Sequence, residues 1–95
     1  MITIAICDDA EQDLRLLETL IRKMNPFDGQ FALDVFSSGE ALLSSPKRPY
    51  DMVVLDVQMP ELSGYTTAQK LRESDQKTVL AFLPAWRRPR SRYSG

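Results

Sequence analysis

The chain has 95 residues, 43% of them hydrophobic and 26% charged, with a net charge of −1, which is the composition of one small globular domain. It contains no run near the ~20 apolar residues that a membrane-spanning helix needs, and no secretory signal pattern, so we predict a cytoplasmic protein without a membrane partner. The absence of histidine excludes Ser-His-Asp catalysis, histidine-ligated zinc and a phosphohistidine on this chain, and the single cysteine excludes an internal disulfide.

The first half of the chain predicts two strands and two helices. Small and apolar residues over 2–7 indicate a strand that is covered on both faces, with Cys7 as a buried packing residue. Residues 11–24 are typical of an amphipathic helix, whose predicted inner face is Leu14, Leu17, Ile21 and Met24. A second strand is predicted over 31–36, and the capping-box spacing of Ser37 to Glu40 then predicts a brief helix that ends near Ser44.

The second half continues the alternation of strands and helices. Residues 52–56 form a short apolar run that ends in a carboxylate, Asp56. A weaker helix follows Ser63, with Tyr65, Ala68 and Leu71 on one face, and residues 78–83 form a fourth predicted strand. Four strands that alternate with three helices predict an α/β fold with a parallel sheet, in which ligand sites lie beyond the carboxyl ends of the strands.

The last twelve residues differ in composition from the rest. Residues 1–83 hold eight Lys and Arg against thirteen Asp and Glu, whereas residues 84–95 hold four arginines and no acid. We therefore predict one domain over 1–83 and a basic, disordered tail over 84–95. Arginines interleaved with Trp86 and Tyr93 also suggest nucleic-acid binding, but twelve residues with two prolines cannot form a reading helix, so we expect no nucleic-acid partner for this chain alone.

Three carboxylates follow predicted strands. Asp8 and Asp9 come directly after the first strand, and Asp56 closes the third. If these strands are neighbours, the carboxylates converge and repel one another, which favours a bound cation or protonation. All-oxygen ligation favours Mg²⁺ or Mn²⁺, which would engage a phosphate group.

A purely structural interpretation of these residues is also open. Asp9 would cap the first helix, with Gln12 at its third position, and Asp8 would be a solvated loop residue. Asp56 would be an ordinary turn residue at a strand end.

Two segments resemble the receiver domains of bacterial two-component response regulators. The first is Ile-Ala-Ile-Cys-Asp8-Asp9, and the second runs from Tyr50 through Asp56 and Met59-Pro60 to Ser63-Gly64. The resemblance covers residues 2–83 and is greatest to receivers that precede LytTR-type DNA-binding domains. It implies a flavodoxin-like, doubly wound parallel sheet with the strand order 2-1-3-4 for the strands that this chain contains.

The resemblance also implies roles for the site residues. Asp56 would accept a phosphoryl group from a partner sensor histidine kinase, as a step of a phosphorelay and not as an enzyme in its own right. Asp8, Asp9, Asp56 and the backbone carbonyl of Gln58 would hold Mg²⁺.

The chain departs from the receiver pattern after the fourth strand. Pro84 stands where receivers carry a Ser or Thr, and we find no counterpart of their fifth strand, its lysine or the last two helices. We therefore interpret the chain as a truncated receiver with impaired output switching. The loss would expose one edge of the fourth strand, which predicts a homodimer or a domain-swapped oligomer.

Two other functions remain open. The chain could act as a non-catalytic interaction protein that competes for a kinase or for a full-length regulator. A hydrolase of the haloacid-dehalogenase type also uses a strand-end aspartate with Mg²⁺, but it requires a second aspartate two residues later, where this chain has Gln58.

Overall fold

The sheet and three helices of the predicted α/β fold are present in the computed structural model, which describes residues 1–24, 29–57, 59 and 63–83. The strands are β1 (Ile2–Cys7), β2 (Phe31–Phe36), β3 (Met52–Asp56) and β4 (Val79–Leu83). The helices are α1 (Glu11–Met24), α2 (Gly39–Leu43) and α3 (Gly64–Arg72). The predicted basic tail over 84–95 lies outside the described residues. No helix of the described part is both long enough and apolar enough to cross a membrane.

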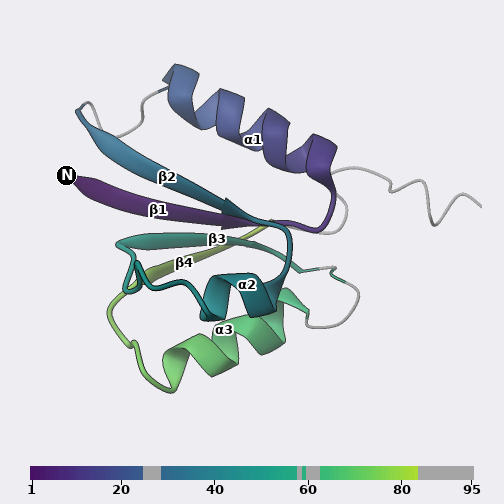
Figure 1. The fold of residues 1–95 in the computed structure, drawn as a ribbon, viewed down its shortest axis with the longest axis vertical. Coiled ribbons are helices and arrows are strands. Elements are labelled where there is room, and N and C mark those ends of the chain that lie inside the picture. Colours follow the sequence, from purple (N-terminus) through teal and green to yellow (C-terminus); the bar gives the residue numbers. More distant parts are fainter. Residues whose placement is uncertain (25–28, 58, 60–62, 84–95) are drawn as a thin grey trace, which may run out of the picture.

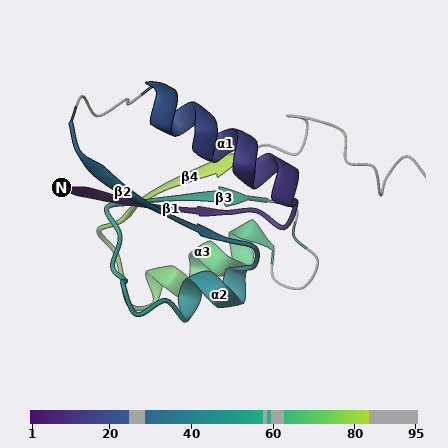
Figure 2. The same cartoon turned by 45° about the horizontal axis from the view of Figure 1, so that its top comes forward.

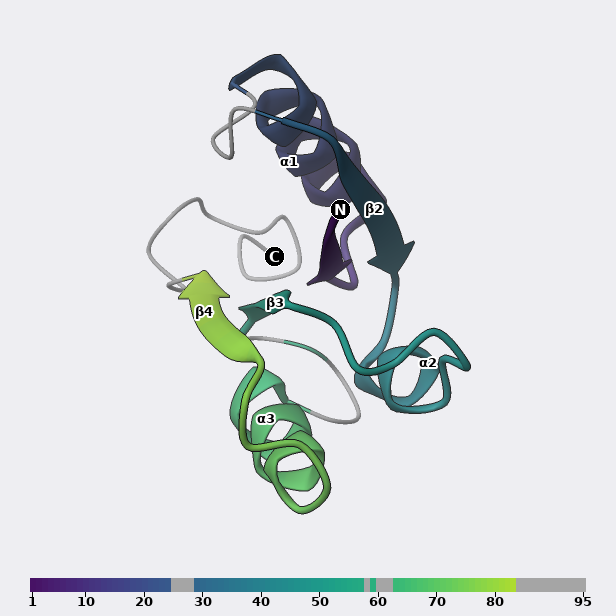
Figure 3. The ribbon, with the colours of Figure 1, turned by 90° about the vertical axis from the view of Figure 1, so that its left-hand side faces the viewer.

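The four strands form one parallel sheet in the order β2-β1-β3-β4, as predicted. Helix α1 covers one face of the sheet, and α2 and α3 cover the other (Figures 1 and 2). Figure 3 shows β2 and β4 at the two edges. This doubly wound arrangement brings the carboxyl ends of β1 and β3 together at the centre of the sheet.

Successive side chains of β1 and β3 point to opposite faces of the sheet, so the core has two layers. Odd-numbered residues face α2 and α3, where Ala5, Val53 and Leu55 form a cluster with Leu42 and Leu71 of the two helices. Even-numbered residues lie on the face that α1 covers, and there Ile4, Ile6, Val54 and Leu14 are buried. Because β1 is covered on both faces, every residue from Ile4 to Cys7 is buried, which explains its unbroken run of small and apolar side chains.

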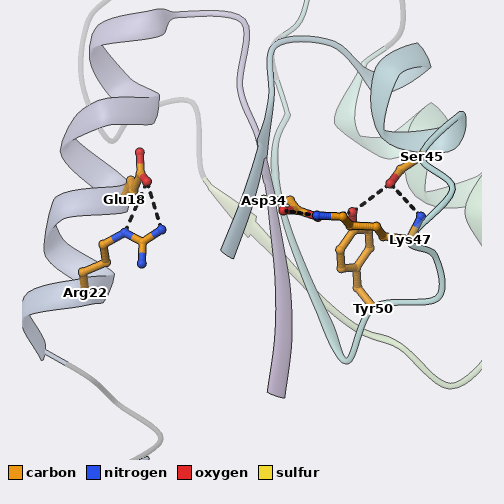
Figure 4. A network of polar contacts seen from close by, with 6 residues as sticks. All are labelled: Glu18, Arg22, Asp34, Ser45, Lys47 and Tyr50. Carbon is orange, nitrogen blue, oxygen red and sulfur yellow. Dashed lines mark hydrogen bonds and ion pairs between the residues drawn. The ribbon is translucent and has the colours of Figure 1, made fainter. Parts of the chain in front are cut away.

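Helix α1 has the predicted bounds, but its apolar residues are only partly covered. Leu14 is buried, Leu17 and Ile21 are half-buried, and the side chain of Met24 lies outside the described part. Leu16 and Leu20, which were not in the predicted inner face, are 49% and 43% exposed. Arg22 pairs with Glu18 one turn earlier at 3.2 Å (Figure 4).

The shorter helices begin at hydroxyl caps. Ser38, not Ser37, caps α2, and its Oγ accepts a hydrogen bond from the N–H of Ala41 at 3.1 Å. Ser63 caps α3 in the same way. Of the three residues predicted to share one face of α3, Ala68 and Leu71 are buried. The side chain of Tyr65 is 62% exposed and contacts the ring of Phe82 on β4. Gly64 and Thr67 occupy the buried positions instead.

Candidate metal centre

Asp8 and Asp56 lie side by side because β1 and β3 are parallel neighbours in a fixed register. Cys7 pairs with Leu55 in the ladder, so the next residue along each strand is an aspartate. The N–H of Asp8 donates to the carbonyl of Phe36 on β2 at 3.1 Å, which fixes the chain beyond the end of β1. Both aspartates are buried, with 0% and 1% of their surface exposed. The predicted convergence of the strand ends is confirmed.

Asp8 also stabilises the turn that leads into α1. Its Oδ1 accepts a hydrogen bond from the N–H of Ala10 at 3.0 Å. The first backbone bond of the helix runs from the N–H of Leu14 to the carbonyl of Ala10, so the helix begins one residue later than a cap at Asp9 requires. The alternative in which Asp8 is a solvated loop residue is wrong, because Asp8 is completely buried.

Asp9 completes a group of three carboxylates with Asp8 and Asp56. One oxygen of each side chain can be chosen so that all three lie within 4.8 Å of one another. Three ionised carboxylates at this separation repel one another, and a divalent cation among them lowers the electrostatic energy. Oxygen donors of this kind suit a hard cation such as Mg²⁺, so the residues fit the implied metal. The fourth predicted ligand, Gln58, lies outside the described residues.

Gly64, the first residue of α3, lies against the backbone of Asp56. A β-carbon at position 64 would meet the carbonyl oxygen of Asp56 and lie 2.9 Å from its carbonyl carbon. The N–H of Gly64 donates to the carbonyl of Val57 at 3.4 Å. Position 64 therefore requires glycine, and the physical cause is the close approach of two backbones.

Cys7 lies directly beside the three carboxylates. It is completely buried, as predicted, and its Sγ is 3.6 Å from the sulfur of Met59. Burial, with a smaller contribution from the charges of Asp8 and Asp56, raises the pKa of the thiol from 9.0 to about 12. Cys7 is therefore a protonated packing residue at neutral pH.

One buried carboxylate near the start of α1 was not predicted. Asp13 is 3% exposed, although an acidic residue in the first turn of a helix is usually solvated and interacts with the helix dipole. Its place in the sequence carries no signal of burial, because it stands between the polar Gln12 and the inner-face residue Leu14.

Comparison with known proteins places these features in a family. Residues 4–92 match the model of the response regulator receiver domain. The transcriptional regulatory protein RprY of Bacteroides fragilis is 32% identical over 83 residues, which are 86% of this chain and 33% of that protein. The chain thus spans about a third of the length of the curated relatives that it matches.

Solved structures agree with this match. The BeF3-activated receiver domain of DrrB from Thermotoga maritima has a TM-score of 0.71 and 26% identity, and covers 86% of this chain and 64% of that one. The response regulator TrrA of the same organism, in complex with Mg²⁺ and BeF, has a TM-score of 0.70 and 29% identity, over 90% of this chain and 70% of that one. The predicted LytTR-associated subtype stays a prediction.

Proposed function

The chain belongs to the response regulator receiver domain family, and on that premise we propose that Asp56 accepts a phosphoryl group from a partner histidine kinase, with Asp8 and Asp9 holding Mg²⁺ beside it. The observation that carries the proposal is the convergence of the three carboxylates from two adjacent strand ends. In this proposal the chain is a phosphoacceptor and has no enzymatic substrate of its own.

The proposed transfer occurs at one carboxylate oxygen of Asp56. That oxygen attacks the phosphorus of the donor phosphohistidine, a new oxygen–phosphorus bond forms, and the phosphorus–nitrogen bond breaks. The electron pair of the broken bond goes to the imidazole nitrogen of the donor, which takes up a proton. The donor histidine lies outside these 95 residues, which contain no histidine.

Asp8 and Asp9 reduce the main obstacle to this reaction, which is the repulsion between an anionic carboxylate and an anionic phosphoryl group. They would hold Mg²⁺ together with Asp56, and Mg²⁺ supplies positive charge that stabilises the transferring phosphoryl oxygens. Burial of Asp8 and Asp56 fixes their positions before the donor arrives, because both aspartates continue strands of the rigid sheet.

Phosphorylation by a small-molecule donor tests the proposal without the unidentified kinase. The protein is incubated with acetyl phosphate and Mg²⁺, and its intact mass is measured. We expect the gain of one phosphoryl group, which should be lost in Asp56→Asn and in the presence of a chelator. Glu73→Gln, at an exposed carboxylate beyond the end of α3, is the matched control and should be modified like the wild type. If the wild type gains no mass, the alternative of a non-catalytic interaction protein is favoured.

Metal binding is measured separately with Mn²⁺ as the probe. We expect weak binding, because a hard cation at such a site keeps much of its water. Asp9→Asn should weaken the binding by roughly tenfold or more, which corresponds to a loss of about 1.4 kcal/mol. Unchanged Mn²⁺ affinity in Asp9→Asn would contradict the metal assignment even if Asp56 is phosphorylated.

A further inference from the structure

The outer edge of β4 presents backbone groups that the sheet does not use. The N–H of Val79 donates to the carbonyl of Asp51 at 3.0 Å, so Val79, Ala81 and Leu83 direct their backbone groups toward β3. The N–H and C=O of Leu80 and Phe82 therefore point away from β3. Within the described residues, β4 pairs with β3 alone. Groups of this kind form a template for another strand.

The two edges of the sheet differ in how they are protected. At the β2 edge, Asp34 accepts a hydrogen bond from the hydroxyl of Tyr50 at 2.7 Å and pairs with Lys47 at 3.6 Å (Figure 4). Charged side chains at an edge oppose the addition of another strand. Strand β4 consists of Val-Leu-Ala-Phe-Leu and carries no charge and no proline, and Val79 and Phe82 are 55% and 39% exposed.

We propose that the β4 edge binds the β4 edge of a second copy of this chain, in an antiparallel pair whose two-fold axis passes between the two Ala81 residues. In this register Leu80 lies opposite Phe82 of the other copy. These are the residues with outward backbone groups, and each such pair exchanges two hydrogen bonds. The two four-stranded sheets then join into one continuous sheet.

Each of the two neighbouring registers would lose backbone hydrogen bonds. Centring the pair on Phe82 places Leu80 opposite Pro84, which has no N–H to donate. Centring it on Leu80 places Phe82 opposite Thr78, whose N–H already donates to Asp75 at 3.2 Å. The register at Ala81 alone uses all the outward groups of Leu80 and Phe82.

The side chains support the same register. Leu80 and Phe82 lie on the face of β4 that α3 covers, and opposite residues of an antiparallel pair share one face, so the two copies would bring these apolar side chains together. A strand pair of this length buries less surface than a standard interface. We therefore expect a weak dimer that forms at high protein concentration and dissociates on dilution.

Cysteine cross-linking tests both the contact and its register. Residues opposite each other at a position without hydrogen bonds have α-carbons about 4.5 Å apart, which is within the range of a disulfide. Ala81→Cys should therefore form a disulfide-linked dimer on mild oxidation. Val79→Cys is the matched control, because its counterpart in the other copy lies roughly 13 Å away. Cys7 is buried and protonated and should not compete.

A second experiment asks whether the edge is the cause of association. Sedimentation of the wild-type 95-residue protein should show a monomer–dimer equilibrium, and Phe82→Lys should shift it to monomer. Val35→Lys, at a residue of the β2 edge that is 44% exposed, should leave it unchanged. A wild type that stays monomeric at high concentration would overturn the proposal, as would equal cross-linking of Val79→Cys and Ala81→Cys.

Discussion

Gly64 packs against Asp56 so closely that a β-carbon at position 64 would overlap the Asp56 carbonyl oxygen. The first residue of α3 therefore supports the last residue of β3, and the position of the proposed phosphoacceptor depends on the absence of a side chain eight residues later. This contact connects the packing of the sheet to the geometry of the metal centre.

Gly64→Ala is expected to destabilise the protein. A glycine-to-alanine change in a helix usually gains about 0.4–1 kcal/mol from reduced freedom of the unfolded chain. The overlap with Asp56 should outweigh this gain, since forcing a methyl group into packed backbone costs about 1–3 kcal/mol. Urea unfolding followed by circular dichroism measures the difference. Gln69→Ala, at an exposed residue of the same helix, is the control and should stay within about 0.5 kcal/mol of the wild type.

Two buried threonines should respond differently to replacement by valine. Thr67 is completely buried, and its hydroxyl oxygen has no hydrogen-bond partner among the described residues, so Thr67→Val should be neutral or raise the free energy of unfolding by about 1 kcal/mol. Thr78 is also buried, but its hydroxyl donates to the carbonyl of Tyr50. Thr78→Val should therefore lower the free energy of unfolding by about 1–3 kcal/mol. Equal effects in urea titrations would contradict this assignment.

Cys7 should react slowly with alkylating reagents in the folded protein. Burial raises the pKa of its thiol from 9.0 to about 12, so the thiolate fraction at pH 8 falls by roughly a thousandfold. A raised thiol pKa also means that the folded state binds more protons than the unfolded state between these two values, so stability should fall as the pH rises above 9. Iodoacetamide labelling with and without urea measures the reactivity, and equal rates would show that the thiol is accessible.

The order and bounds of the elements were largely predictable from local patterns. The strand over 31–36 and the helix over 11–24 have the predicted ends, because β-formers in one and apolar periodicity in the other stop at clear turn signals. The fourth strand begins at Val79 and not at Thr78, because the N–H and hydroxyl of Thr78 bond outside the ladder.

Features that depend on tertiary contacts were not predictable. Tyr65 has the spacing of a buried residue, yet Thr67 takes the buried position because the close approach of Gly64 to Asp56 sets the rotation of α3. The carboxylate cluster was predictable because strand ends and strand order fix it. The burial of Asp13 and the exposure of Leu16 depend on which other parts of the protein cover α1. A local sequence pattern carries no information about those tertiary contacts.

Output switching should be impaired. The residue that follows β4 is Pro84, which offers no hydroxyl to a phosphoryl group, and only contacts that differ between two forms can shift their populations. We expect a beryllofluoride adduct, which stands in for the phosphoryl group, to change amide spectra near Asp8, Asp9 and Asp56 only. A coordinated change through Val79–Leu83 would show that another group performs the switch.

The identity of the phosphorylated residue tests the central claim most directly. After treatment with acetyl phosphate and Mg²⁺, borohydride reduces an acyl phosphate to an alcohol and releases phosphate, so the modified aspartate becomes homoserine. Peptide mass mapping then locates it. We predict homoserine at position 56, and none at Asp8 or Asp9. Homoserine at Asp8 or Asp9 with Asp56 unchanged, or at none of the three, would contradict the assignment of Asp56 as the phosphoacceptor.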